Sequence, residues 1–199
     1  LEALSKANVI VFDKTGTLTN AQPKVADIIT FANRDKTEML RLAACLEEHF
    51  PHSVANAVVN EAKEQNLNHE ERHSKVEYIV AHGISSIVDG EKVVIGSSHF
   101  IFDDENCEVP KDEINKFNSI PNEYSHLYMA INKQLAAVIC IEDPIKDNVQ
   151  NTLNDLRKNG IEKIVMMTGD SERTAKAVAK KLGIDEYYAE VMPEDKAEF

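Results

Sequence analysis

The chain of 199 residues has no tryptophan, seven glycines, six prolines and few long apolar runs. The longest uninterrupted apolar stretch is Leu135 to Ile141, far short of the roughly 18 residues that a membrane-crossing helix needs. We therefore expect no membrane span in this sequence. The modest glycine and proline content and the 43% hydrophobic residues exclude collagen-like and disordered chains.

Positive charge is also scarce. The chain has 22 Lys and Arg against 34 Asp and Glu, which gives a formal net charge of −12, and it contains no dense basic run. Such a surface repels nucleic-acid phosphates. We therefore do not expect nucleic acid to be a partner.

The three cysteines lie far apart, at Cys45, Cys107 and Cys140, with no C-x-x-C motif and no histidine at ligand spacing beside them. This pattern predicts neither a structural zinc site nor a disulfide framework. The sequence starts at Leu1 without a targeting segment, and the helix start at 193–196 is followed closely by Phe199. We expect the chain to be an excised piece of something longer.

Two apolar runs predict a parallel sheet. Residues 8–12 are nearly all β-forming and are typical of a strand buried on both faces, and residues 163–167 predict a second buried strand. Amphipathic helices that end at Gly160 and Gly183 flank the second strand. This alternation predicts a doubly wound α/β domain with its ligand site at the carboxyl ends of the strands.

The middle of the chain has a different pattern. Residues 35–66 predict two helices interrupted at Phe50-Pro51, and residues 76–96 alternate with a period of two around an Asp89-Gly90 turn. A further strand pair, 127–131 and 135–141, turns at Asn132-Lys133. We expect a self-contained α+β domain inserted in the α/β domain. The predicted boundaries are 22–139 for the insert and 1–21 with 140–199 for the α/β domain, with hinges near 22–23 and 142–144.

The segment 13–19 reads D-K-T-G-T-L-T and begins where the first predicted strand ends. The Asp13 carboxylate therefore projects from the sheet edge where α/β folds bind ligands. A carboxylate there can attack phosphorus to form an aspartyl-phosphate, provided that cations and backbone N–H groups neutralise the phosphoryl charge. Gly16 permits a close backbone approach, the threonine hydroxyls can donate hydrogen bonds, and Lys14 supplies positive charge.

This segment resembles the phosphorylation motif of P-type ATPases, the cation and lipid pumps of the haloacid dehalogenase superfamily. Two later segments match the same family in the same order, Thr168-Gly169-Asp170 and 193–196. The resemblance implies that Asp13 is the nucleophile and that Lys196 stabilises charge. The residues that it implies for catalysis are Asp13, Lys14, Thr15, Thr168 and Lys196, with Gly169 and Asp170 grouped among the nucleotide-binding residues.

The resemblance also implies a metal and a hinge. The Asp13 carboxylate and the Thr15 carbonyl would ligate Mg²⁺, and Thr168 would hold the phosphoryl oxygens. Asp143-Pro144 and Lys146 match a hinge element of the D-P-x-R/K type.

Thr15 distinguishes a pump from a phosphatase. Soluble phosphatases of this superfamily usually carry a second acid at that position, which protonates the leaving group and then activates water. With Thr15 there, a phosphoenzyme should hydrolyse slowly, which suits a transport cycle. A stand-alone phosphatase and a non-catalytic nucleotide-sensing module remain the alternatives.

The small insert resembles the nucleotide-binding domain of heavy-metal (type IB) P-type ATPases. Glu47 and His52 match the adenine-binding Glu and the His of the H-P motif in that family, although proline here precedes the histidine at Pro51 and Ser53 follows it. That departure leaves open whether His49 or His52 is functional. We favour His52, because the next residues continue the helix of the family in register.

Two glycines complete the implied nucleotide site. Gly83 matches the second glycine of a G-x-G pair whose first position is Ala81, and Gly96-Ser97 matches a G-N pair. Glycine lets backbone approach a flat base, and Ser97 can still donate a hydrogen bond. The implied nucleotide-binding residues are thus Glu47, His52, Gly83, Gly96, Ser97, Gly169 and Asp170.

By this resemblance the chain is the phosphorylation and nucleotide-binding fragment of a pump that couples ATP hydrolysis, through an aspartyl-phosphate on Asp13, to heavy-metal transport. ATP and Mg²⁺ are the implied cofactors. The implied partners are the actuator domain and transmembrane helices of the parent pump, at the cytosolic face of a membrane. We expect the fragment to bind ATP but to phosphorylate itself poorly, because a further Mg²⁺-ligating Asp of the family should follow Lys196.

Overall fold

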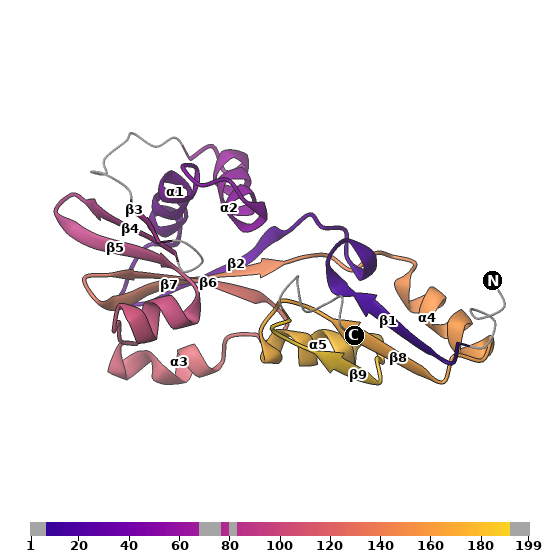
Figure 1. Ribbon diagram of the computed structural model, residues 1–199. Helices are drawn as coiled ribbons and strands as arrows, with labels where there is room; N and C mark the ends of the chain where they lie inside the picture. Colours follow the sequence, from indigo (N-terminus) through magenta and orange to yellow (C-terminus); the bar gives the residue numbers. More distant parts are fainter. Residues whose placement is uncertain (1–6, 68–76, 80–82, 192–199) are drawn as a thin grey trace. The chain divides into compact units, whose positions relative to one another are not determined.

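The computed structural model describes residues 7–67, 77–79 and 83–191, and the chain divides into two compact units (Figure 1). The α/β unit comprises residues 1–22 and 143–199, and the inserted unit runs from Pro23 to Glu142. The insert ends at Glu142 rather than at the expected residue 139, because the last strand of its sheet continues until Glu142 pairs with Lys24. No helix among the described residues has the length and apolar character to cross a membrane.

The α/β unit is built on a parallel sheet in the order β1-β8-β9. These strands are β1 (Val9–Asp13), β8 (Lys163–Met167) and β9 (Glu186–Tyr188), and the helices are α4 (Val149–Lys158) and α5 (Glu172–Leu182). Both helices lie where the sequence predicts them. The terminator of α5, Gly183, has a left-handed conformation with φ of 66°, which glycine adopts without strain.

The core of this unit joins both helices to β8. Ile164 and Met166 are fully buried and pack with Leu153 of α4 and with Ala175 and Ala179 of α5. Ile164 and Met166 are two residues apart and therefore lie on the same face of β8, so the two helices share one set of strand side chains.

Strand β1 is less buried than its sequence predicts. Val9 and Val11 are 44% and 47% exposed, whereas Ile10 and Phe12 are partly buried. Within the described residues β1 pairs with β8 alone, so it is an edge strand of the sheet. The expectation of burial on both faces is wrong here, because an apolar sequence does not by itself supply a second covering layer.

The inserted unit contains a six-stranded antiparallel sheet in the order β2-β7-β6-β5-β4-β3. Its strands are β2 (Lys24–Thr30), β3 (Glu77–Ile79), β4 (Gly83–Val88), β5 (Glu91–Gly96), β6 (Ser125–Ile131) and β7 (Gln134–Glu142). Both predicted hairpin turns are confirmed. Asp89-Gly90 and Asn132-Lys133 each have two consecutive positive φ angles, the geometry that matches the twist of paired strands.

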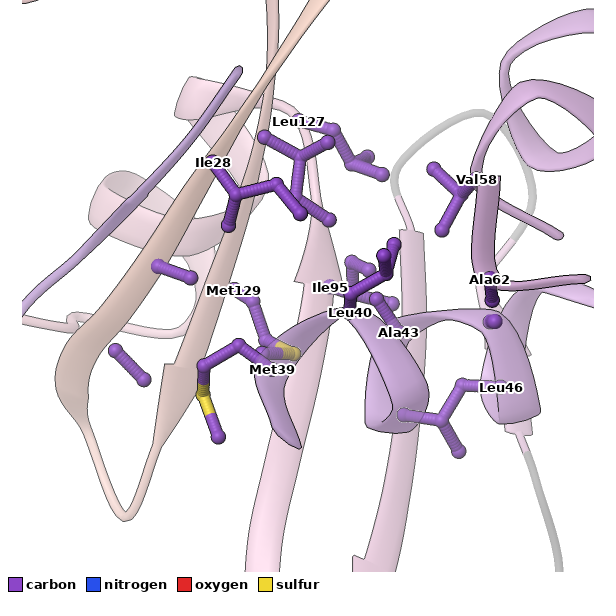
Figure 2. Packing of buried hydrophobic residues seen from close by; sticks show 14 of the residues in the cluster. Ile28, Met39, Leu40, Ala43, Leu46, Val58, Ala62, Ile95, Leu127 and Met129 are labelled. Carbon is purple, nitrogen blue, oxygen red and sulfur yellow. The ribbon is translucent and has the colours of Figure 1, made fainter. Parts of the chain in front are cut away.

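Two helices pack on one face of this sheet, α1 (Lys36–Glu47) and α2 (Ser53–Glu64). They separate at residues 50–51, as predicted. The Asp35 side chain caps α1 by accepting the Glu38 N–H. Figure 2 shows the cluster between these helices and the sheet. Its labelled residues are Ile28, Met39, Leu40, Ala43, Leu46, Val58, Ala62, Ile95, Leu127 and Met129.

A second cluster includes residues that alternate along the same strands with those of the first cluster and so lie on the other face of the sheet. Tyr128 and Phe31 pack there with Phe102 and Phe117 through edge-on ring contacts. Phe102 belongs to the short helical element η3 (Phe100–Asp104) and Phe117 to α3 (Ile114–Asn118), which follows the short helix η4 (Lys111–Glu113). Strand β2 and these short elements were not predicted, since none has a long periodic pattern.

Candidate functional site

Asp13 and Thr168 lie at the same end of the parallel sheet. Asp13 is the last residue of β1 and is in register with Met167, the last residue of β8, so Thr168 follows immediately beside it. Asp13 is exposed, whereas Thr168 is 1% exposed. The parallel pairing therefore brings the first two segments of the family motif to one edge.

A buried ion pair connects these two segments. The Lys14 Nζ lies 2.6 Å from Asp170 Oδ2, and the Lys14 side chain is 7% exposed. Thr168 Oγ1 donates to the same Asp170 oxygen at 2.6 Å and accepts the Asp170 N–H at 3.1 Å. The positive charge of Lys14 is thus held against Asp170, and Asp170 acts as the acceptor at the centre of this network.

The turn η2 (Lys14–Leu18) between β1 and the hinge is held by side chains that the sequence did not assign to it. Gly16 has φ of 77°, and its N–H donates to Thr19 Oγ1, which is within hydrogen-bond distance of Asp143 Oδ2. Lys146 Nζ donates to the Gly16 carbonyl at 2.7 Å. The D-P-x-K segment therefore fixes the turn as well as lying at the unit boundary.

A pocket of about 290 Å³ opens in the inserted unit. Five residues that the resemblance implied line it: Glu47, His52, Gly83, Gly96 and Ser97. The remaining wall is largely apolar and includes Val54, Ile84, Ile95 and Leu127. A mostly apolar cavity of this size with a few polar groups is typical of small-molecule sites.

Glu47 is the buried acid of this pocket. It is 2% exposed, and its Oε2 atom accepts no hydrogen bond. Burial raises the pKa of Glu47 from 4.5 to about 7. His52 Nε2 lies 3.4 Å from Glu47 Oε2, close enough for an ion pair but without the geometry of a hydrogen bond.

His52 has a structural role besides lining the pocket. It is the N-cap of α2, and its Nδ1 accepts the Ala55 N–H at 3.2 Å. Partial burial lowers the pKa of His52. His49, the alternative considered from the sequence, is exposed and is not among the pocket-lining residues.

Gly83 and Ser97 are constrained by the fold itself. A Cβ at Gly83 would lie 2.4 Å from the Ile95 carbonyl oxygen and 2.5 Å from Phe100 Cδ1, so the sheet and the ring require glycine there. The Ser97 hydroxyl accepts the Phe100 N–H at 3.2 Å. A hydroxyl that accepts one bond keeps its own proton, so Ser97 can still donate to a ligand.

The predicted Mg²⁺ ligands belong to β1 and to the turn that follows it. Among the residues with described positions, no group of three or more His, Cys, Asp or Glu side chains is placed to hold a metal ion. Asp13 and the Thr15 carbonyl offer oxygen atoms only, which suits Mg²⁺, an ion that proteins bind through one or two carboxylates together with substrate phosphates. Lys196 lies outside the described residues, as does Ala81.

Comparison with known proteins identifies the family. The haloacid dehalogenase-like hydrolase family matches residues 7–199. A copper-exporting P-type ATPase of Legionella pneumophila is 40% identical over 201 residues, which cover 99% of this chain and 26% of that protein. A zinc-exporting P-type ATPase of Mycobacterium marinum is 36% identical over 200 residues, which cover 100% of this chain and 27% of that protein. The chain thus spans about a quarter of these relatives.

Solved structures agree with the sequence comparison. A zinc-transporting PIB-type ATPase in the E2.Pi state has a TM-score of 0.69 at 30% identity, with 99% of this chain and 31% of that chain covered. The catalytic CPx-ATPase domain CopB-B has a TM-score of 0.67 at 28% identity, with 99% and 66% covered. The resemblance and the fold class inferred from the sequence are confirmed. The chain belongs to the haloacid dehalogenase-like hydrolase family, and along its whole length it is homologous to the phosphorylation and nucleotide-binding region of heavy-metal P-type ATPases.

Proposed function

We propose that the inserted unit binds ATP in its pocket and that Asp13 of the α/β unit is the phosphoryl acceptor. The observation that carries this proposal is the convergence of Glu47, His52, Gly83, Gly96 and Ser97, which come from distant parts of the chain, on one cavity of about 290 Å³. An adenine ring fits such a site chemically, because its faces are apolar and its edge carries hydrogen-bonding groups.

The phosphoryl step follows from the position of Asp13. A carboxylate oxygen attacks the γ-phosphorus, an acyl-phosphate bond forms, and the bond from phosphorus to the β-γ bridging oxygen breaks, with its electron pair leaving on ADP. Backbone N–H groups of the turn after β1 would orient phosphoryl oxygens, and the Thr168 hydroxyl would do so by exchanging its hydrogen bond to Asp170 for one to the phosphoryl group. Asp13 and the Thr15 carbonyl would hold Mg²⁺, which neutralises phosphate charge when bound.

Lys14 and Asp170 act as positioning residues in this proposal. Their ion pair ties the turn that follows β1 to the turn that follows β8. Because Lys14 is almost fully buried, the pair is rigid, and the two turns keep their relative placement at the sheet edge.

The activity of the whole protein is proposed from its relatives. The names of the matched proteins specify copper or zinc export, and we propose that a protein containing this chain transports a heavy-metal cation. The remaining domains would be an actuator domain and transmembrane helices, with this region on the cytosolic face of the membrane.

Titration calorimetry tests the nucleotide site. The full chain should bind ATP, and His52→Ala should weaken binding by about tenfold or more, the loss expected when a polar contact to the ligand is removed. His49→Ala is the matched control, since that histidine is exposed and outside the pocket. Equal affinities for wild type and His52→Ala, or a loss confined to His49→Ala, would contradict the assignment.

Acyl-phosphate formation tests Asp13. In a protein that contains this region with its neighbouring domains, γ-labelled ATP should label a base-labile phosphate, and Asp13→Asn should remove the label because an amide cannot form the acyl-phosphate. Labelling that persists in Asp13→Asn would reject Asp13 as the acceptor. Fast hydrolysis of generic phosphate esters would favour the phosphatase alternative.

A further inference from the structure

The Glu47 carboxyl group is buried without a cationic partner among the described residues. The titratable side chains lining its pocket are Glu47, His52 and His126, and the described wall contains no lysine or arginine. The ring of His126 is engaged elsewhere, because Nε2 contacts the Pro121 carbonyl at 2.9 Å and Nδ1 contacts the Tyr128 hydroxyl. The adjoining Glu48 and His49 are exposed.

His52 is poorly suited to act as the missing cation. Its Nδ1 accepts the Ala55 N–H, so the neutral ring carries its proton on Nε2, which faces Glu47. Protonation of Nδ1 would place two donors against each other and remove the cap of α2. The cap therefore favours neutral imidazole and leaves the Glu47 carboxyl without a counterion.

The position of Glu47 in its helix also disfavours the ionised carboxylate. Glu47 is the last residue of α1, where the helix dipole presents its negative end and disfavours a carboxylate. Together with the 2% exposure and an Oε2 atom that accepts no hydrogen bond, this favours the protonated acid at neutral pH. The rise of the Glu47 pKa through burial is consistent with this geometry.

We propose that the protonation state of Glu47 sets the base preference of the pocket, with the neutral acid accepting adenine and the ionised carboxylate favouring guanine over adenine. This inference rests on the proposed function, since it requires a nucleobase in the pocket. The neutral carboxyl group presents one donor beside one acceptor, which complements the adenine N1 acceptor and the N6–H donor. The carboxylate presents two acceptors, which repel adenine N1 but match the N1–H and N2–H donors of guanine.

The neutral acid can also form hydrogen bonds with guanine, through O6 and N1–H. The informative measurement is therefore the change with pH in the ratio of the GTP and ATP dissociation constants. Ionisation removes the match to adenine and creates a second one to guanine. With a Glu47 pKa of about 7, only about one molecule in thirty stays neutral at pH of about 8.5. The ratio of GTP to ATP dissociation constants should therefore fall about 30-fold between about pH 6 and pH 8.5.

The experiment is a calorimetric titration of the full chain with ATP and with GTP at several pH values. The ratio of the two dissociation constants cancels titration of the triphosphate and of His52, which both nucleotides share. Glu47→Gln keeps one donor and one acceptor at every pH, so its ratio of GTP to ATP dissociation constants should match that of the wild type at acid pH and should not change with pH. Glu47→Ala should weaken ATP binding and give a ratio that does not change with pH, and Glu48→Gln should behave as wild type.

The outcomes separate this inference from the proposed function. ATP binding that depends on His52 but shows a constant ratio across the pH range in wild type would overturn the inference and leave the nucleotide site intact. A loss of ATP binding in Glu47→Gln as large as in Glu47→Ala, with the fold retained by circular dichroism, would also overturn it. Absence of binding by both nucleotides at every pH would reject the proposed function itself.

Discussion

Replacing Glu47 by glutamine should stabilise the inserted unit by an amount that grows as pH rises from about 4.5 to about 7 and then stays constant. In the folded unit burial holds the pKa of Glu47 at about 7, above its ordinary value of 4.5. Between these pH values the folded state therefore binds more protons than the unfolded state, so the free energy of unfolding falls as pH rises. Glutamine has no such titration, because its amide remains neutral.

The size of the effect follows from the shift. A pKa that rises from 4.5 to about 7 corresponds to about 3 kcal/mol, at about 1.4 kcal/mol for each pH unit. The stability difference between Glu47→Gln and wild type should be close to zero below about pH 4.5 and should reach about 3 kcal/mol above about pH 8. His52, whose pKa is lowered, costs stability at acid pH in both proteins and cancels in the comparison.

Urea unfolding at a series of pH values measures this difference. Circular dichroism follows the transition, and hydrogen exchange of the β7 amides assigns it to the inserted unit. Glu48→Gln is the matched control, because it removes the same charge from an exposed neighbouring residue and should change stability by less than about 0.5 kcal/mol. A Glu47→Gln protein whose stability follows the same pH curve as wild type would refute the claim that Glu47 is buried without a counterion.

Two further predictions concern packing and the phosphorylation turn. Gly83→Ala should destabilise the inserted unit by about 1–3 kcal/mol, because its Cβ would meet Phe100 at 2.5 Å. The Cβ of Gly169→Ala meets nothing nearer than 3.7 Å, so this control should lose little stability. Equal urea midpoints for the two variants would contradict the prediction. Lys14→Met should destabilise the α/β unit by about 3 kcal/mol, because Asp170 loses its buried partner. Adding Asp170→Asn should recover part of that loss in a double-mutant cycle. Additive losses in the cycle would show that the pair does not interact.

Several elements could be predicted because a short stretch of sequence specifies them. The helices α1 and α2, the Asp89-Gly90 turn and the Gly183 terminator depend on capping, periodicity and left-handed backbone, which are local properties. Strand β2 could not be predicted in this way. It is defined by pairing with β7, more than a hundred residues later in the chain, and its own residues alternate poorly.

The predicted nucleotide residues illustrate the same distinction at the site. Glu47 and His52 were chosen by resemblance, and the structure places both beside Gly83 and Gly96 in one pocket. Nothing in the local sequence indicates that Glu47 is nearly inaccessible or that His52 caps a helix with Nδ1. The role of Asp143 in holding Thr19 was also missed, because these residues are distant in the chain.

The sequence by itself determined the chemistry that is available: a carboxylate after a strand, the T-G-D turn, the acid and histidine of the insert, and the family to which they belong. Tertiary structure decided the state of each group. Folding buried Lys14 against Asp170, left one face of β1 exposed, and enclosed Glu47 in a pocket without a cation among the described residues. The physical reason is that solvation and charge pairing depend on neighbours distant in the chain, which residue identity and spacing do not specify.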